Sequence, residues 1–189
     1  MSSLPNEATD SINWMTRSGF FTAADLCDII TEEVFEPGEL DASAVIAAID
    51  KAFAAWRSEQ AAYPEVTDYN RLANAFKALN ADGIIAMHKA GLTQSHGYSD
   101  FREALSEHAT PDSVRGYCFY HSQDLERAFQ GHGLYLAFGP KRQDDDQTVW
   151  SSVGQAAVAT LTDAGLNPTW DGTPNQRIHL ADFRWQRRG

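Results

Sequence analysis

Three polar residues follow a predicted strand in the segment GYCFYHSQDLERA, residues 116–128: His121, Gln123 and Asp124. An imidazole and a carboxylate three residues apart can reach one edge of a sheet. His179, from another predicted strand, would complete a set of two histidines and one carboxylate. Such a set can hold a metal ion and leave coordination positions open. The pattern therefore predicts, as one alternative, an enzyme that acts on a small molecule or uses a metal at this strand end.

The same residues have a simpler use as the start of a helix. Ser122 can serve as the N-cap, and Asp124 then lies in the first turn, where it stabilises the helix by about 1 kcal/mol. His121 becomes a strand-end histidine with one ring nitrogen satisfied. We favour this interpretation because scattered histidines and carboxylates often produce ligand-like sets by coincidence. We assign neither a metal nor a cofactor.

The segment TWDG places the large ring of Trp170 beside the acid of Asp171. Trp170 can stack on a ligand while Asp171 binds it, but more often such a ring closes the edge of a core and Asp-Gly forms a turn. A small-molecule site here would form a pocket lined by Trp170, Tyr120 and His121. The candidate ligand-binding residues are therefore His121, Gln123, Asp124, Trp170, Asp171 and His179.

Known catalytic signatures are mostly missing from the sequence. It contains no phosphate loop ending in Gly-Lys-Ser, no GxSxG, no HExxH and no CxxC. The GHG segment at 131–133 favours a turn rather than a dinucleotide site. Cys118 and His121 leave opposite faces of a strand, so Cys118 is predicted to be a core residue. No catalytic residue is assigned.

The charge of the chain is acidic and uneven. Of the net charge of −11, residues 1–64 carry −8, from 3 Lys+Arg against 11 Asp+Glu, and residues 65–189 carry −3, from 12 against 15. Phosphates repel an acidic protein, so direct nucleic-acid binding is disfavoured. An acidic face can instead meet a basic protein partner, although a solvated face is the more frequent use.

The lengths of the apolar runs, the first ten residues and the number of cysteines all indicate a cytoplasmic protein. None approaches the length of a membrane span, and the start MSSLPNEATD lacks the basic and apolar regions of a secretory signal. Cys27 and Cys118 are the only cysteines, and both lie inside periodic segments as buried thiols. We therefore expect a cytoplasmic location and no membrane partner.

An aromatic stripe near the C-terminus is the most plausible protein-binding surface. Phe183 and Trp185 alternate along the last predicted strand, and Arg184, Arg187 and Arg188 frame them in a stretch that is poor in acids. Packing beneath the N-terminal helices is an equally weighted alternative. The candidate protein-binding residues are Phe183, Trp185 and Arg187.

Hydrophobic periodicity predicts an acidic helical segment over residues 1–64. Thr22 and Asp25 have the spacing of a capping box, and Asp41 can cap the next helix. That helix places Val45, Ile49, Phe53 and Trp56 on one face.

Residues 65–189 alternate short apolar runs with helical patterns, which predicts an α+β fold. The clearest helix begins near Val149 and ends at Gly165. A short turn joins the last two runs, so the sheet is mixed rather than purely parallel. We predict about five strands, covered by helices.

The ordered segments GIIAMHKAGLTQSHG, GYCFYHSQDLERA, GLYLAFG, AGLNPTWDG and RIHLADFRWQRR resemble a bacterial family described only as a domain of unknown function. The resemblance covers roughly residues 65–189. It implies a bacterial, cytoplasmic protein and supplies no catalytic residue. From the acidic N-terminal third, the Phe183 and Trp185 stripe and the lack of catalytic signatures, we expect a non-enzymatic protein that binds another protein, as an accessory or inhibitor-like factor. The alternative is the enzyme at His121, Asp124 and His179, and the oligomeric state stays open.

Overall fold

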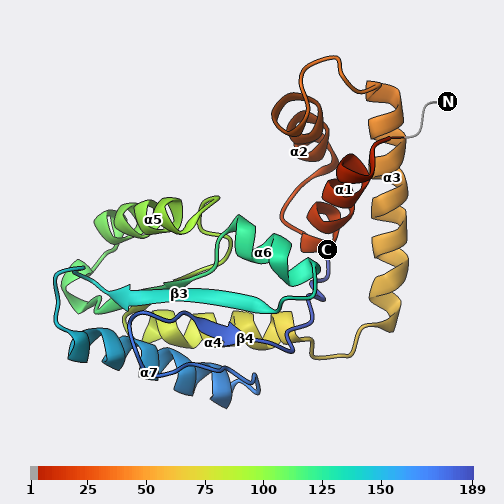
Figure 1. Ribbon diagram of the computed structural model, residues 1–189. Coiled ribbons are helices and arrows are strands. Elements are labelled where there is room, and N and C mark those ends of the chain that lie inside the picture. The colour runs from red at the N-terminus through yellow and green to blue at the C-terminus, as the bar shows by residue number, and fades with distance from the viewer. Residues whose placement is uncertain (1–3) are drawn as a thin grey trace. The chain divides into compact units, whose positions relative to one another are not determined.

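The chain forms two compact units in the computed structural model, which describes residues 4–189 (Figure 1). The first unit comprises the residues up to Thr67 together with Trp185–Gly189, and the second comprises Asp68–Arg184. The sequence places the boundary near residue 64 and assigns all later residues to the sheet domain. The last five residues instead belong to the helical unit.

Residues 4–67 form three α-helices: α1 (Asn6–Ser18), α2 (Ala23–Asp28) and α3 (Ala42–Glu59). A π-helix continues α2 over Ile29–Val34. The predicted capping box is present, because the Thr22 side chain accepts a bond from the backbone N–H of Asp25 and the Asp25 carboxylate accepts one from that of Thr22. Asp41 caps α3 by accepting a bond from the backbone N–H of Ser43.

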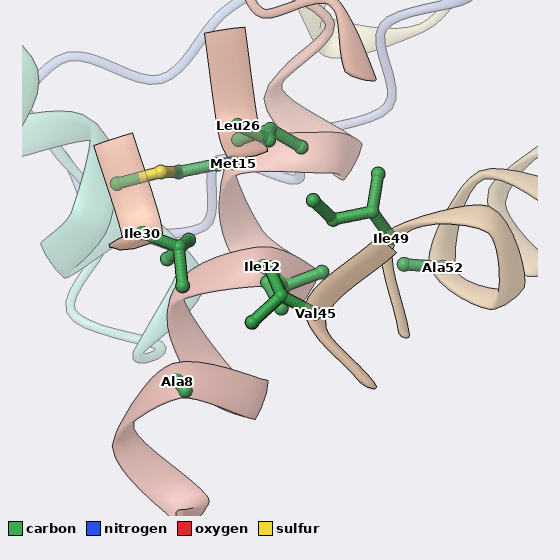
Figure 2. Close-up of a cluster of buried hydrophobic side chains, with 8 residues drawn as sticks. All are labelled: Ala8, Ile12, Met15, Leu26, Ile30, Val45, Ile49 and Ala52. Atoms are coloured by element: carbon green, nitrogen blue, oxygen red, sulfur yellow. The ribbon is translucent and has the colours of Figure 1, made fainter. Parts of the chain in front are cut away.

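The core of the first unit lies where these three helices meet (Figure 2). Apolar residues spaced by three or four positions place one face of α1 and one face of α3 toward each other. The π-helix adds Ile30, and α2 adds Leu26. The buried cluster consists of Ala8, Ile12, Met15, Leu26, Ile30, Val45, Ile49 and Ala52.

The C-terminal segment packs within the first unit. The Trp185 indole Nε1 donates a hydrogen bond to the Ser18 carbonyl at 3.2 Å, and its ring lies 6.0 Å from that of Phe20. The Arg187 guanidinium lies 4.1 Å from the Phe20 ring centroid. Trp185 is only 9% exposed, and Phe183, which belongs to the second unit, is 8% exposed. The two aromatic side chains are therefore not available as the exposed stripe that the sequence offered as one alternative.

The second unit contains a four-stranded mixed sheet with the order β1-β2-β3-β4. The strands are β1 (Ile84–Met87), β2 (Gly116–Phe119), β3 (Leu134–Pro140) and β4 (Ile178–Leu180). β1 and β2 are parallel, and β3 is antiparallel to both β2 and β4. The α+β class and the mixed sheet are thus confirmed.

The fifth predicted strand is reduced to one bridge between Thr169 and His179. Beyond this bridge, the Asp171 carboxylate accepts bonds from the backbone N–H and the hydroxyl of Thr173. This turn bends the chain away from the sheet, so the ladder does not extend. The sheet therefore has four strands rather than about five.

Helices cover both faces of the sheet (Figure 1). One face carries α5 (Gln94–Glu107) and α6 (Ser122–Phe129), and the other carries α4 (Asp68–Ala81) and α7 (Gln147–Asp163). α7 ends at the predicted glycine, because Gly165 has a left-handed φ of 84°. No helix within residues 4–189 is long and apolar enough to cross a membrane.

Helix α5 approaches the sheet closely because residue 97 is a glycine. A Cβ atom there would lie 2.8 Å from Phe119 Cζ, 2.9 Å from the Ala90 carbonyl oxygen and still closer to Phe119 Cε2. Phe119 is fully buried, and its ring stacks on that of Tyr117 with centroids 5.4 Å apart. The position therefore has no space for any side chain.

The outer edge of β1 is occupied by a side chain from α4. The Ala86 backbone N–H donates to Asn80 Oδ1 at 3.0 Å, and Asn80 Nδ2 donates to the Ala86 carbonyl at 3.1 Å. The amide thus completes the two hydrogen bonds that a neighbouring strand would make with Ala86.

Candidate functional site

His121 and Asp124 do lie together, at the junction of β2 and α6. The N-cap of α6 is His121 rather than the predicted Ser122. The Asp124 backbone N–H donates to His121 Nδ1 at 3.3 Å, and the His121 backbone N–H donates to Asp124 Oδ2 at 3.3 Å. Together these bonds form a capping box with an imidazole in place of the usual hydroxyl. The prediction that Asp124 lies in the first turn of a helix is thus confirmed, but the capping residue is His121 and not Ser122.

Arg177, which the sequence interpretation missed, completes this cluster. Its Nη1 lies 2.7 Å from Asp124 Oδ1. The Asp124 side chain is fully buried and that of Arg177 is 25% exposed, so the buried charge has a partner that reaches solvent. Arg177 directly precedes β4, and 53 residues separate it from Asp124. No local pattern could have indicated the pair.

The hydrogen bonds define the tautomer of His121. Because Nδ1 accepts a bond from the Asp124 backbone, the proton of the neutral ring is on Nε2, which lies 3.0 Å from Asp124 Oδ2. Burial lowers the pKa of His121, and the neighbouring Asp124 carboxylate only partly offsets this effect. Both ring nitrogens are therefore engaged, and neither is free to accept a proton from a substrate or to bind a metal.

The stability of the second unit should fall as the pH falls below about 6.5, the ordinary pKa of histidine. Burial lowers the pKa of folded His121, so between the two pKa values the unfolded chain binds more protons than the folded one. The expected loss from this group is at most about 1.4 kcal/mol per pH unit. Urea unfolding at about pH 7.5 and about pH 5.5 would measure it.

His121→Asn is the matched control for this pH dependence. Asparagine is a good N-cap but does not titrate in this range. All other ionisable groups are unchanged, so the variant should lose less stability than the wild type over the same pH step. An equal loss in both proteins would show that His121 does not carry the effect.

The other predicted ligand-binding residues lie in different surroundings. Gln123 is exposed on α6. The His179 ring stacks on Tyr135 with centroids 4.0 Å apart, and its Nε2 donates to the His132 carbonyl at 2.9 Å. Trp170 Nε1 donates to the Thr173 carbonyl at 2.9 Å. Trp170 thus stabilises the turn that follows Thr169.

A shallow groove of about 410 Å³ brings three of these predicted residues together. We call it the sheet groove. It does not contain Tyr120, which is fully buried with its hydroxyl 3.0 Å from His88 Nδ1, so the predicted pocket of Trp170, Tyr120 and His121 is wrong. The sheet groove is lined by Tyr135, Thr169, Trp170, Asp171, Gln176, Arg177 and His179.

A second groove, of about 490 Å³, lies within the first unit and was not predicted. We call it the helix groove. Its walls come mainly from α1 and α3, and Asp41 and Lys51 are the only charged residues among the described residues that line it. The groove follows a side of α3 on which alanines are spaced along the helix. The sequence prediction used the positions of large apolar residues, so it did not detect a groove lined by small ones. The lining residues are Leu4, Thr9, Ile12, Asn13, Asp41, Ser43, Ala44, Ala47, Ala48, Lys51, Ala52 and Ala55.

The described part of the chain, residues 4–189, contains no group of three or more His, Cys, Asp or Glu side chains placed to hold a metal ion. Cys118 is fully buried, and burial raises the pKa of its thiol to about 12. A thiol with this pKa stays protonated and unreactive near neutral pH.

Comparison with known proteins gives a family but no function. No curated protein and no solved structure matches the chain. A family model described as a domain of unknown function, DUF6891, matches residues 2–189. The match includes the helical N-terminal part, which the resemblance in sequence had left out. The chain therefore belongs, over nearly its whole length, to the DUF6891 family.

Proposed function

We propose that this protein is a protein-binding module and that its binding surface is the helix groove. The observation that supports the proposal is an open cavity of about 490 Å³ whose lining is almost entirely uncharged, in the more acidic part of the chain. A concave surface lined mostly by apolar side chains is the usual form of a binding site.

The partner we propose is an amphipathic helix with basic flanks. Alanines at 44, 47, 48, 52 and 55 line the groove along α3, and small side chains let a helix backbone approach closely. A helix that docks in a groove places apolar residues at helical spacing into it. The charge of −8 over residues 1–64 attracts a cationic partner and speeds its association. The same charge repels a second copy of this chain.

A synthetic helical peptide with leucines at helical spacing and lysines elsewhere would test this proposal. Its dissociation constant for the full chain can be measured by fluorescence anisotropy. Ala48→Trp should fill the groove and weaken binding by about tenfold or more, equivalent to about 1.4 kcal/mol. The matched control is Ala54→Trp, an exposed position on the same helix that does not line the groove. It should bind like the wild type.

Three outcomes would contradict the proposal. Ala48→Trp and Ala54→Trp could bind the peptide equally well, which would indicate nonspecific attraction to an acidic surface. A peptide with glutamates in place of the lysines could bind as tightly. Ultracentrifugation could show a dimer that Ala48→Trp dissociates, which would make a second copy the occupant of the groove.

A further inference from the structure

The guanidinium of Arg177 has one edge without a partner. Arg17 uses its Nε and Nη2 to bind the two oxygens of Glu59, at 2.9 and 2.6 Å. Arg115 uses the same edge for the carbonyl and carboxylate of Asp82. Arg177 bonds only through Nη1, so its Nε and Nη2 make no hydrogen bond within the described residues. That edge presents two parallel donors, the arrangement that matches a carboxylate.

The surroundings hold this guanidinium in place. Asp124 is fully buried and fixed by the capping box with His121, and it anchors Nη1 at 2.7 Å. On the sheet, the Tyr135 ring centroid lies 4.9 Å from the guanidinium carbon. A side chain held from two sides loses little conformational freedom when it binds a ligand. Arg177 is therefore organised before any ligand arrives.

The rest of the sheet groove offers aromatic surface next to this edge. Tyr135, His179 and Trp170 line it together with Arg177. We propose that the sheet groove is a binding site for a small aromatic carboxylate, with the carboxylate on Arg177 and the ring against the aromatic lining. The guanidinium of Arg177 is already paired with Asp124, and Asp171 adds a carboxylate to the lining. These charges favour a singly charged carboxylate over a doubly charged phosphate.

To test the site, the isotope-labelled full chain would be titrated with benzoate, and binding would be monitored by the chemical shifts of the backbone amides. Benzoate should shift the backbone amides of Tyr135 and of residues 169–173 and 175–179. Benzamide, which has the same shape without the charge, and cyclohexanecarboxylate, which has the charge without the aromatic ring, should each bind at least several-fold more weakly. Phenyl phosphate provides the comparison between the two oxyanions.

Two variants and one control assign the binding to the proposed groups. Arg177→Lys keeps a cation for Asp124 but lacks the two parallel donors, so the benzoate dissociation constant should rise about tenfold. Tyr135→Leu removes a ring without changing any charge and should also weaken binding. Arg127→Gln removes an exposed cation of α6 that does not line the groove, and it should bind benzoate like the wild type.

The proposal would be overturned if benzoate shifted none of these amides, or if Arg177→Lys bound it as well as the wild type does. Tighter binding of phenyl phosphate than of benzoate would overturn the choice of a carboxylate. This experiment concerns only the second unit, so its result is independent of peptide binding in the helix groove.

Discussion

Asp124→Ala is expected to destabilise the second unit by about 4 kcal/mol, because it removes one partner of a buried ion pair. The Asp124 side chain is fully buried, and it binds Arg177 Nη1, His121 Nε2 and the His121 backbone. The substitution leaves the guanidinium without its anion and one end of α6 without its capping box. Hydrogen exchange of the β2 and β3 amides, which belong to this unit, would measure the loss.

Asp124→Asn is the matched control for the charge. Its side chain has the same shape, and one oxygen can still accept the bond from Arg177. We expect a loss smaller than that of Asp124→Ala. A loss below about 0.5 kcal/mol in Asp124→Ala, the size of an ordinary surface substitution, would contradict the view that this cluster stabilises the fold.

Gly97→Ala is expected to destabilise the second unit by about 2–3 kcal/mol, the upper part of the range found when a core is overpacked. The new methyl would overlap the Phe119 ring, which is fully buried against Tyr117 and cannot move aside. Alanine is favoured over glycine in a helix by about 1 kcal/mol, so propensity alone predicts the opposite sign. Denaturant unfolding, followed at the β2 amides, would decide between the two.

Ser95→Ala is the control on the same helix. Ser95 is exposed on α5, so its replacement should leave the stability within about 0.5 kcal/mol of the wild type. A Gly97→Ala variant as stable as Ser95→Ala would mean that α5 can lift away from Phe119 at little cost.

Local signals in the sequence predicted local features of the structure. The capping box of Thr22 and Asp25, the cap at Asp41 and the glycine after α7 each depend on contacts within a few residues, and all three are present. The α+β class follows from the alternation of strand and helix patterns, which is also a property of short windows.

Features that depend on distant residues could not be predicted in this way. The spacing of His121 and Asp124 indicated that they meet, but the ion pair with Arg177 spans 53 residues. Whether Trp185 is exposed or buried likewise depends on Ser18, which lies 167 residues away along the chain. The fifth strand was expected from its apolar residues, yet a turn at Asp171 and Thr173 limits it to one bridge. In each case the outcome depends on tertiary packing rather than on local preference.

The amide of Asn80 has a consequence for how this protein behaves at high concentration. An exposed strand edge is a template on which another chain can add a strand, and such addition is a common route to aggregation and fibrils. At β1 the central donor and acceptor of that edge are already taken by Asn80. Recruitment of a foreign strand at β1 would first have to break both bonds, so this side of the sheet resists polymerisation.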